Sequence, residues 1–364
     1  MIVVSAKGDY MRELFKINLR LFDQTAPMKS TDGAAGGATD NNLQAEIKTY
    51  YVKELLKNAA PQLVYNQFGQ KKPIPKGAGK TIEWRKFSKL PPATTPIVEG
   101  VVPKGSKRSV ITKTASPMQY GDYIRHTDIL ETTAFDPIIT EDCKEQGVQA
   151  GKTIDVLTRD KLMAGTNVMY ANGKISRATL TDKTADVITV NDVYKAVNRL
   201  QRMDVAPVEG GSYVAIVHPD IYTQLMLDEK WIDVNKYSNA SNIFNGEVGK
   251  IGNCRFVSTS QAPIVPSKLT GSNPADDALG VYQTLFLGAN AYGTTELEGL
   301  GLEYIIKPRG YNDELDLVGS TGWKMTHGCR ILDQTAILRY ESLSFRSDEA
   351  DIYTYNSLED TDKG

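Results

Sequence analysis

Cysteine and histidine are scarce in this sequence, with three of each in 364 residues. The cysteines are odd in number and far apart in the chain: Cys143, Cys254 and Cys329. This pattern excludes a disulfide framework and a paired-cysteine zinc site, and it favours a reducing compartment such as the cytoplasm. Of the histidines, only His327 has a second ligand type at metal-site spacing, Cys329, and two ligands do not complete a site. We therefore predict neither a metal nor a cofactor.

Neither sign of charge is in excess, and long apolar runs are missing. Lysine and arginine number 42 against 44 for aspartate and glutamate, a net charge of −2, so no global basic field exists to hold nucleic acid. No run approaches the ~18 apolar residues of a membrane span. The N-terminus reaches Lys7 and Asp9 too early for a signal peptide. We expect a soluble protein of about two domains, without contact to a membrane.

Motifs for catalysis and nucleotide binding are also missing. No Gly-x-Ser-x-Gly elbow occurs to support a serine nucleophile. The stretch Gly77-Ala-Gly-Lys-Thr81 is part of a phosphate-loop pattern, but Ile74 stands where the first glycine is needed, and a strand pattern follows instead of a helix. We interpret Gly77 and Gly79 as a flexible hinge, and we assign no catalytic or nucleotide-binding residue.

What the sequence does contain is a long ribbon that is poor in core residues. Residues 82–87 alternate like a strand, and residues 110–114 are rich in β-branched side chains. The link between them, about twenty residues rich in proline and glycine, far exceeds the two to five of an ordinary hairpin. Because an isolated hairpin is marginal in water, we interpret the ribbon as an arm that becomes ordered against another molecule. Three cations near the tip of the arm can pair with acidic groups on the neighbouring molecule: Lys104, Lys107 and Arg108.

Segments on either side of the ribbon are predicted from their patterns. Residues 1–42 combine a strand-like stretch, 16–22, with a glycine-rich linker, which predicts an arm that is disordered on its own. A helix begins near Asn41 and ends before Pro61, and residues 117–131 read as a strand.

A long helix is predicted from Asp136-Pro137 to Gly165, because aspartate is a good N-cap, proline suits the first helical position and glycine ends helices. Such a helix is roughly 40 Å long. Gly147 and Gly151 share a face on which another backbone can approach closely.

Residues 187–290 alternate helix and strand patterns, as in a compact α/β unit. They predict a helix capped near Asn191, a buried strand at 213–217 and a helix at 219–228, with His218 in a turn-and-cap role between the last two. A surface loop at 267–279 is followed by further strands near the C-terminal end.

Four stretches then carry a resemblance: Pro75 to Phe87 (PKGAGKTIEWRKF), Gln119 to Tyr123 (QYGDY), Val217 to Asp220 (VHPD) and Gly322 to Lys324 (GWK). Together with the order of the parts, they make the chain resemble a tailed-phage major capsid protein with the HK97-like fold, in the group found in N4-like phages. The resemblance covers most of residues 43–345.

The resemblance implies an α+β fold with a defined layout. From this resemblance we expect an N-terminal arm at 1–42, a helix region at 43–68 and an extended loop (E-loop) at 69–118. We also expect a peripheral domain at 119–186 whose spine helix spans 136–165. An axial domain follows at 187–294, and residues 295–364 supply return strands of the peripheral domain and a C-terminal tail.

The implied function is assembly rather than catalysis. The chain is expected to form hexamers and pentamers of an icosahedral shell around double-stranded DNA, built in the host bacterial cytoplasm, with a portal protein and possible scaffolding and decoration proteins as partners. Within the E-loop, aromatic side chains are the expected anchors on a neighbour. The expected E-loop contacts are Trp84, Arg85, Phe87, Lys104, Lys107 and Arg108, and those of the N-terminal arm are Arg12, Lys16, Leu19, Arg20 and Phe22.

Two other functions stay open at this point. An encapsulin-like compartment shares the fold but packages enzymes instead of a genome. A nucleotide-dependent enzyme would have to use the Gly-Lys-Thr stretch, which Ile74 and the following strand pattern oppose.

Overall fold

A computed structural model describes residues 42–60, 63–88, 90, 92–96, 99–100, 102, 105–133, 138–208, 211–228, 231, 247–270, 273–274, 278–307 and 317–348. The side chains of residues 42–50, 131–133, 247–248, 269–270 and 273–274 are not described. Apart from the first two residues of α1, the described residues belong to one compact unit, Gln44–Gly364. The predicted contacts of the N-terminal arm lie outside the described residues, as does Lys104.

A seven-stranded sheet has the order β5-β16-β12-β6-β8-β7, with β9 paired to β12. Its strands are β5 (Val168–Tyr170), β6 (Tyr213–Val217), β7 (Glu247–Ile251), β8 (Cys254–Ser258), β9 (Ile264–Pro266), β12 (Gly280–Leu287) and β16 (Ile337–Ser342). β6 and β12 are buried along their whole length, as expected for strands covered on both faces. Two helices, α4 (Val190–Arg202) and α5 (Pro219–Met226), contribute apolar side chains to the core on one face.

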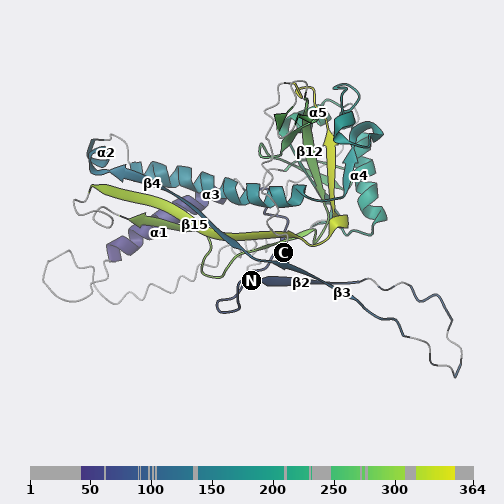
Figure 1. The fold of residues 1–364 in the computed structure, drawn as a ribbon, viewed down its shortest axis with the longest axis horizontal. Helices are drawn as coiled ribbons and strands as arrows, with labels where there is room; N and C mark the ends of the chain where they lie inside the picture. The colour runs from purple at the N-terminus through teal and green to yellow at the C-terminus, as the bar shows by residue number, and fades with distance from the viewer. Residues whose placement is uncertain are drawn as a thin grey trace, which may run out of the picture. The chain divides into compact units, whose positions relative to one another are not determined.

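A five-stranded sheet joins β1 (Gln70–Lys71), β13 (Tyr292–Thr295), β15 (Val318–Ile331) and β14 (Glu303–Lys307), and β4 (Met118–Thr127) pairs with β15. The long helix α3 (Ile138–Met163) runs along β4 and β15 (Figure 1). Cys143 and Ala150 of α3 form one core cluster with Tyr304, Trp323 and Met325 of the sheet. One face of this sheet is therefore covered by helix.

The N-terminal helix α1 (Asn42–Ala59) packs against α3 at a glycine. A Cβ atom at Gly147 would lie 2.7 Å from the carbonyl oxygen of Leu55, too close for any side chain. Nearby, the thiol of Cys143 donates to the carbonyl oxygen of Tyr51, 3.1 Å away. The prediction that Gly147 allows a close backbone approach is thus confirmed.

Smaller elements complete the fold. They are the hairpin strands β2 (Ile82–Phe87) and β3 (Val110–Ala115), the short helix α2 (Asp128–Thr133), the ribbon strands β10 (Leu269–Thr270) and β11 (Asn273–Pro274), and the 3-10 turns η3 (Ala171–Gly173), η4 (Arg177–Thr179) and η6 (Gln334–Ala336). No helix in these described ranges is long and apolar enough to cross a bilayer.

Some predicted elements are confirmed and others are corrected. The long helix is present, although Asp136 and Pro137 lie outside the described residues. The helix predicted to be capped near Asn191 instead has Thr189 as its N-cap, since Thr189 and Asp192 form a reciprocal capping box. The strand predicted over 117–131 ends at Thr127, where α2 begins. The predicted loop at 267–279 contains the paired strands β10 and β11.

Strand pairing also differs from the predicted layout. β16 lies in the range 295–364 assigned to the peripheral domain, yet it pairs antiparallel with β12 from Tyr282↔Ser342 to Leu287↔Ile337. Conversely, β13 begins inside the range 187–294 and pairs with β15. Backbone hydrogen bonds between segments distant in sequence, which no local pattern encodes, decide the sheet to which each strand belongs.

The close approach at Gly147 makes a stability prediction. Gly147→Ala should lower the free energy of unfolding by about 1–3 kcal/mol, because the added methyl group forces α1 and α3 apart. Urea unfolding measures the change. Gly105→Ala is the matched control, since nothing lies within 4 Å of a Cβ at Gly105. Equal stability of the two variants would contradict the packing described here.

Candidate functional site

The ribbon singled out in the sequence is a two-stranded antiparallel hairpin. β2 and β3 pair from Ile82↔Ala115 to Phe87↔Val110. The pairing continues one step further, where the amide of Ser88 donates to the carbonyl oxygen of Ser109 at 3.0 Å. The predicted strands are thus confirmed.

The base of the hairpin is built into the body of its own chain. Ile82 and Trp84 are buried with Ile74 in a small apolar cluster, and Trp84 is only 6% exposed. A Cβ atom at Gly293 of β13 would lie 2.7 Å from the Trp84 ring, so the indole rests directly on the sheet backbone. This corrects the prediction that Trp84 anchors a neighbouring subunit. Its ring is used inside the chain, where it holds the hairpin to the five-stranded sheet.

An ion pair attaches β2 to the body at a second residue, on the same strand face as Trp84. The ammonium group of Lys86 contacts the carboxylate of Asp333, in the connection between β15 and β16. Burial favours the neutral acid, but hydrogen bonds from Lys86 and Thr335 outweigh it and lower the pKa of Asp333. Trp84 and Lys86 together fix where the hairpin leaves the body.

The opposite face and the outer part of the hairpin are exposed. Phe87, Val110 and Ile111 are each about half exposed, at 48%, 48% and 51%. The guanidinium of Arg108 lies 3.9 Å from the centre of the Phe87 ring, a cation–π contact. Arg85 pairs with Glu83 of its own strand at 3.5 Å, and such an exposed pair adds little stability. Phe87 and Val110 pair directly and share this face, and we call the set Phe87, Arg108 and Val110 the hairpin patch. Ile111 pairs with Lys86 and is exposed on the other face.

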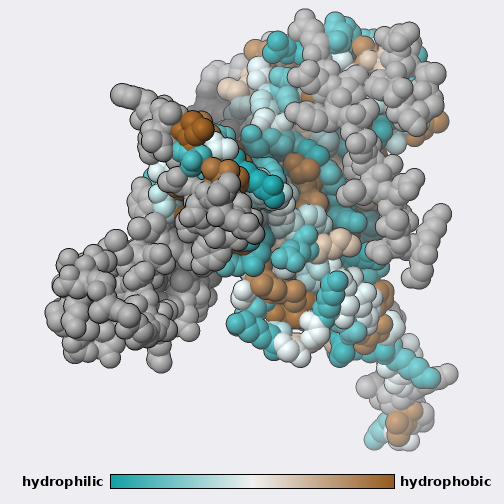
Figure 2. Space-filling model, turned by 60° about the vertical axis from the view of Figure 1, so that its left-hand side comes forward, coloured by the Kyte–Doolittle hydropathy of each residue, from teal (hydrophilic) through white to brown (hydrophobic). Residues whose placement is uncertain are grey.

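Figure 2 shows how hydrophobic residues are distributed over one face of the molecule. On the face shown in Figure 2, hydrophobic residues lie in several separate patches among hydrophilic ones. Small patches of this kind suit contacts that form between folded subunits and leave each subunit dispersed in water beforehand.

The two glycines predicted as a hinge have backbone geometry that favours glycine. Gly77 and Gly79 have φ angles of +81° and +89°, and no atom lies within 4 Å of a Cβ built on either. Their neighbour Lys80 is followed by β2 and not by a helix, so the phosphate-loop geometry is not formed. The hinge role itself stays a prediction.

The histidines occupy structural positions. His218 caps α5, where its Nδ1 atom accepts from the amide of Asp220 at 3.3 Å, which confirms the predicted role. His327 is buried beside Thr158, with 2.9 Å between Nε2 and Oγ1, and burial lowers its pKa to about 4. His126 lies 3.6 Å from a carboxylate oxygen of Asp142. Within the described ranges, no group of three or more His, Cys, Asp and Glu side chains is placed to hold a metal.

A buried carboxylate ties the segment before the hairpin to α3. Asp155 is fully buried, and its Oδ1 atom accepts from the amides of Val64, Tyr65 and Asn66 at 2.9, 2.6 and 3.3 Å. Burial outweighs these hydrogen bonds and the nearby Arg159, and it raises the pKa of Asp155 to about 7. No sequence pattern indicated this group, because its partners are backbone amides about ninety residues away.

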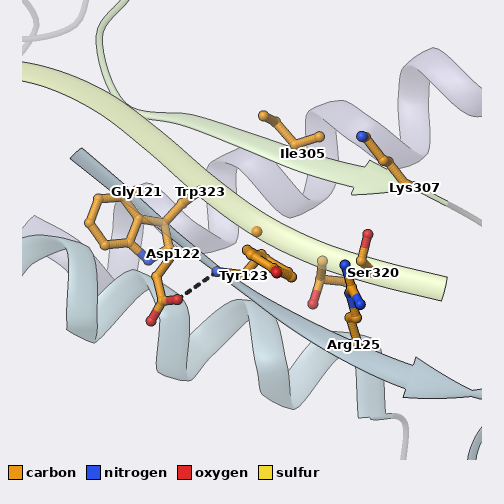
Figure 3. Close-up of a pocket in the computed structure, with 10 residues that line it drawn as sticks. Gly121, Asp122, Tyr123, Arg125, Ile305, Lys307, Ser320 and Trp323 are labelled. Atoms are coloured by element: carbon orange, nitrogen blue, oxygen red, sulfur yellow. Dashed lines mark hydrogen bonds between the residues drawn. The ribbon is translucent and has the colours of Figure 1, made fainter. Parts of the chain in front are cut away.

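A hollow on the five-stranded sheet was also missed by sequence reasoning (Figure 3). It lies over β4, β15 and β14, and Gly121 and Gly322 form part of its lining. Gly322 pairs with Tyr123 on one side and with Ile305 on the other. A sequence signal existed in the glycines of β4 and β15, but only the strand register brings Gly121 and Gly322 close together.

The chain can now be compared with known proteins. No family model and no curated protein sequence matches it. Solved structures do match: the capsid of cyanophage P-SCSP1u has a TM-score of 0.59 at 12% identity, over 78% of this chain and 88% of that one. The chain has an HK97-like capsid fold.

Other capsids support the same conclusion about the fold. The capsid of Ralstonia phage GP4 gives a TM-score of 0.57 at 14% identity, over 90% of this chain and 97% of that one. The head structure of Helicobacter pylori bacteriophage KHP40 gives 0.56 at 13% identity, over 75% of this chain and 88% of that one. The α+β fold class expected from the sequence is confirmed.

Trp84 and Phe87 should behave differently when they are replaced. Trp84→Ala removes the ring that rests on Gly293 and should weaken the attachment of the hairpin by about 3 kcal/mol. Amide exchange in β2 should then accelerate about 100-fold. Phe87→Ser should leave exchange at Ile82 and Glu83 unchanged, because its side chain is half exposed. Similar acceleration in both variants would refute the inward role of Trp84.

Asp155 predicts a pH-dependent stability. Its carboxyl keeps a proton up to about pH 7 in the folded chain but only to about pH 4 in the unfolded chain. The folded state therefore binds more protons in this window, and the contribution of Asp155 to stability falls as pH rises from about 4 to about 7. Asp155→Asn should flatten the melting-temperature profile between these values. An unchanged profile would mean that other groups dominate it.

Proposed function

We propose that this chain is the major capsid protein of a tailed phage of the N4-like group, and that it acts by assembly and not as an enzyme. The observation that carries the proposal is the match to the GP4 capsid, which spans 97% of that chain and leaves little of the fold unaccounted for. In this function, copies of the chain form hexamers and pentamers of an icosahedral shell. Double-stranded DNA, a portal protein and scaffolding or decoration proteins are the proposed partners, and assembly takes place in the host cytoplasm.

The hairpin supplies the proposed contact between subunits. Its base is fixed by Trp84 and Lys86, so the strands project from a defined point. The hairpin patch beyond that base is half exposed in the single chain. Fully burying a phenylalanine contributes about 1.5–3 kcal/mol, so burial of the exposed half of Phe87 on a neighbour adds roughly 1 kcal/mol.

Charged residues of the hairpin are proposed to set register more than affinity. Arg108 of the hairpin patch and its neighbour Lys107 are exposed, and Lys104 precedes them in sequence. Exposed charges at the rim of an interface steer partners and exclude wrong ones, while contributing little net energy. Gly77 and Gly79 are proposed as a hinge in the segment that leads into β2, where their positive φ angles are ones that glycine adopts without strain.

The remaining parts keep their proposed roles with altered boundaries. Residues 1–42 are proposed as an arm that reaches a neighbouring subunit, α3 as the spine of the peripheral domain, and the seven-stranded sheet as the centre of the axial domain. The axial domain takes β5 and β16 in addition to the strands between 187 and 294. These assignments follow the strand pairing and not the order along the chain.

Removing the outer hairpin tests the function. Deletion of Ser88 to Arg108, bridged by a short turn, should give a folded chain that no longer forms shells, because the base cluster stays and the projecting part is lost. Electron microscopy and sedimentation of the purified protein are the measurements. The full chain should give closed particles, and the deletion variant only subunits or small oligomers.

A control separates loss of assembly from loss of folding. The deletion variant should melt within a few degrees of the full chain, and Lys152→Glu, a charge change on the exposed side of α3, should leave particles intact. Normal shells from the deletion variant would overturn the contact role of the hairpin. Full chains that never form closed particles would overturn the proposed function.

A further inference from the structure

The face of the five-stranded sheet that α3 does not cover carries the hairpin base at Gly293, but it is open over β4, β15 and β14. Successive residues of a strand point to opposite faces. Trp323 and Met325 point toward α3, so Ser320, Gly322 and Lys324 lie on the other face. The hollow of Figure 3 lies on this open face.

The hollow has a bare floor and partly apolar sides. Gly121 and Gly322 present no side chain, and a Cβ at either would lie within 3 Å of the neighbouring strand. Tyr123, 61% exposed, and Ile305 stand beside Gly322 in the same cross-strand row. The cavity measures about 330 Å³, room for a short extended peptide segment.

Two cations stand next to this floor. Ser320 pairs with Arg125 on β4 and with Lys307 on β14, so a hydroxyl lies between a guanidinium and an ammonium group in one row. Both cations are exposed, and among the described residues neither has a carboxylate within 4.0 Å. Arg125 lies over the ring of Tyr123, 5.3 Å from its centre.

Nearby carboxylates are already engaged. Glu303 pairs with Lys324 at 3.3 Å. Asp122, at the rim, accepts from Gln149 of α3 at 2.6 Å and from the amide of Tyr123 at 2.8 Å. Within the part of the chain that the structure describes, no carboxylate therefore balances the positive charge of Arg125 and Lys307. An acidic segment with apolar side chains matches this surface in both charge and lining.

We propose that the hollow receives the acidic C-terminal segment, residues 349–364, of a second copy of the chain. The segment carries five acidic residues against one lysine: Glu349, Asp351, Glu359, Asp360 and Asp362, with Lys363. It also offers apolar groups for the sides of the hollow, among them Ile352 and Leu358. The hairpin tip fits less well, because Lys107 and Arg108 repeat the charge of the hollow.

Reach argues for a second copy rather than the same one. Ser320 and Ile331 are about 36 Å apart along β15, which leads from the hollow toward the seven-stranded sheet (Figure 1). Asp348 lies six residues after the end of β16, a strand of that other sheet, and pairs with Lys183. The chain from 348 to Glu359 spans at most about 40 Å when fully extended, and to Asp362 about 50 Å. Contact within one copy would need a largely extended segment, at a loss of conformational entropy.

Binding of a labelled peptide with the sequence of residues 349–364 tests the proposal. The receptor is the full chain with its own segment neutralised by Glu349→Gln, Asp351→Asn, Glu359→Gln, Asp360→Asn and Asp362→Asn. Fluorescence anisotropy at low ionic strength should show saturable binding. Arg125→Glu with Lys307→Glu should weaken it at least tenfold, and Lys152→Glu should leave it unchanged.

A charge exchange gives the sharper result. A peptide with lysine in place of Glu359, Asp360 and Asp362 should regain affinity for the Arg125→Glu, Lys307→Glu receptor and lose it for the parent receptor. Equal binding to the reversed and the Lys152→Glu receptors would overturn the proposal. So would binding at Arg125 and Lys307 of a peptide of residues 88–109, or of a single-stranded oligonucleotide, in place of the acidic peptide. These measurements use single subunits, so their failure leaves the proposed shell function standing.

Discussion

The structure depends on the unequal treatment of the two faces of one long strand, β15. Trp323 and Met325 on one face are buried under α3, together with Tyr304 of β14. Gln146 of α3 donates to the carbonyl oxygen of Thr321 at 3.1 Å, and Trp323 donates to Gln149 at 2.9 Å, so polar groups fix the register of helix on sheet. The other face carries cations, glycines and the exposed Tyr123 near Gly322, and Trp84 of the hairpin base covers it at Gly293. One face therefore holds the core, and among the described residues the region around Gly322 on the other face remains uncovered.

The hairpin also has a buried part and an exposed part, but these follow one another along its length. Near the body, Ile82 and Trp84 supply enough apolar contact to hold β2 against β13. Further out, the same strand exposes Phe87, and its partner exposes Val110 and Ile111. Because its base packs on the sheet, the hairpin projects in a fixed direction. Its outer side chains remain exposed. That combination lowers the entropy lost when the outer part is bound.

Local patterns in the sequence predicted what local forces decide. The strand 213–217 and the cap at His218 follow from a buried β-branched run and from helix N-terminus chemistry. The close approach at Gly147 follows from helical spacing. Alternation alone placed Trp84 and Phe87 on opposite faces but gave no sign of which face the body covers. The hollow, Asp155 and the pairing of β16 with β12 all depend on residues far apart in sequence.

Contacts that are weak one by one are sufficient to hold a closed shell together. The contact made by the hairpin patch therefore does not need to be strong. A contact worth a few kcal/mol gives only millimolar affinity between two free subunits. In a closed symmetric ring, each subunit makes the same contact twice, and later contacts form at high effective concentration. Modest apolar area per hairpin is therefore compatible with a stable assembly. In the proposed shell, a modest patch would also keep single subunits from associating before enough of them are present, which a larger exposed patch on the hairpin would not do.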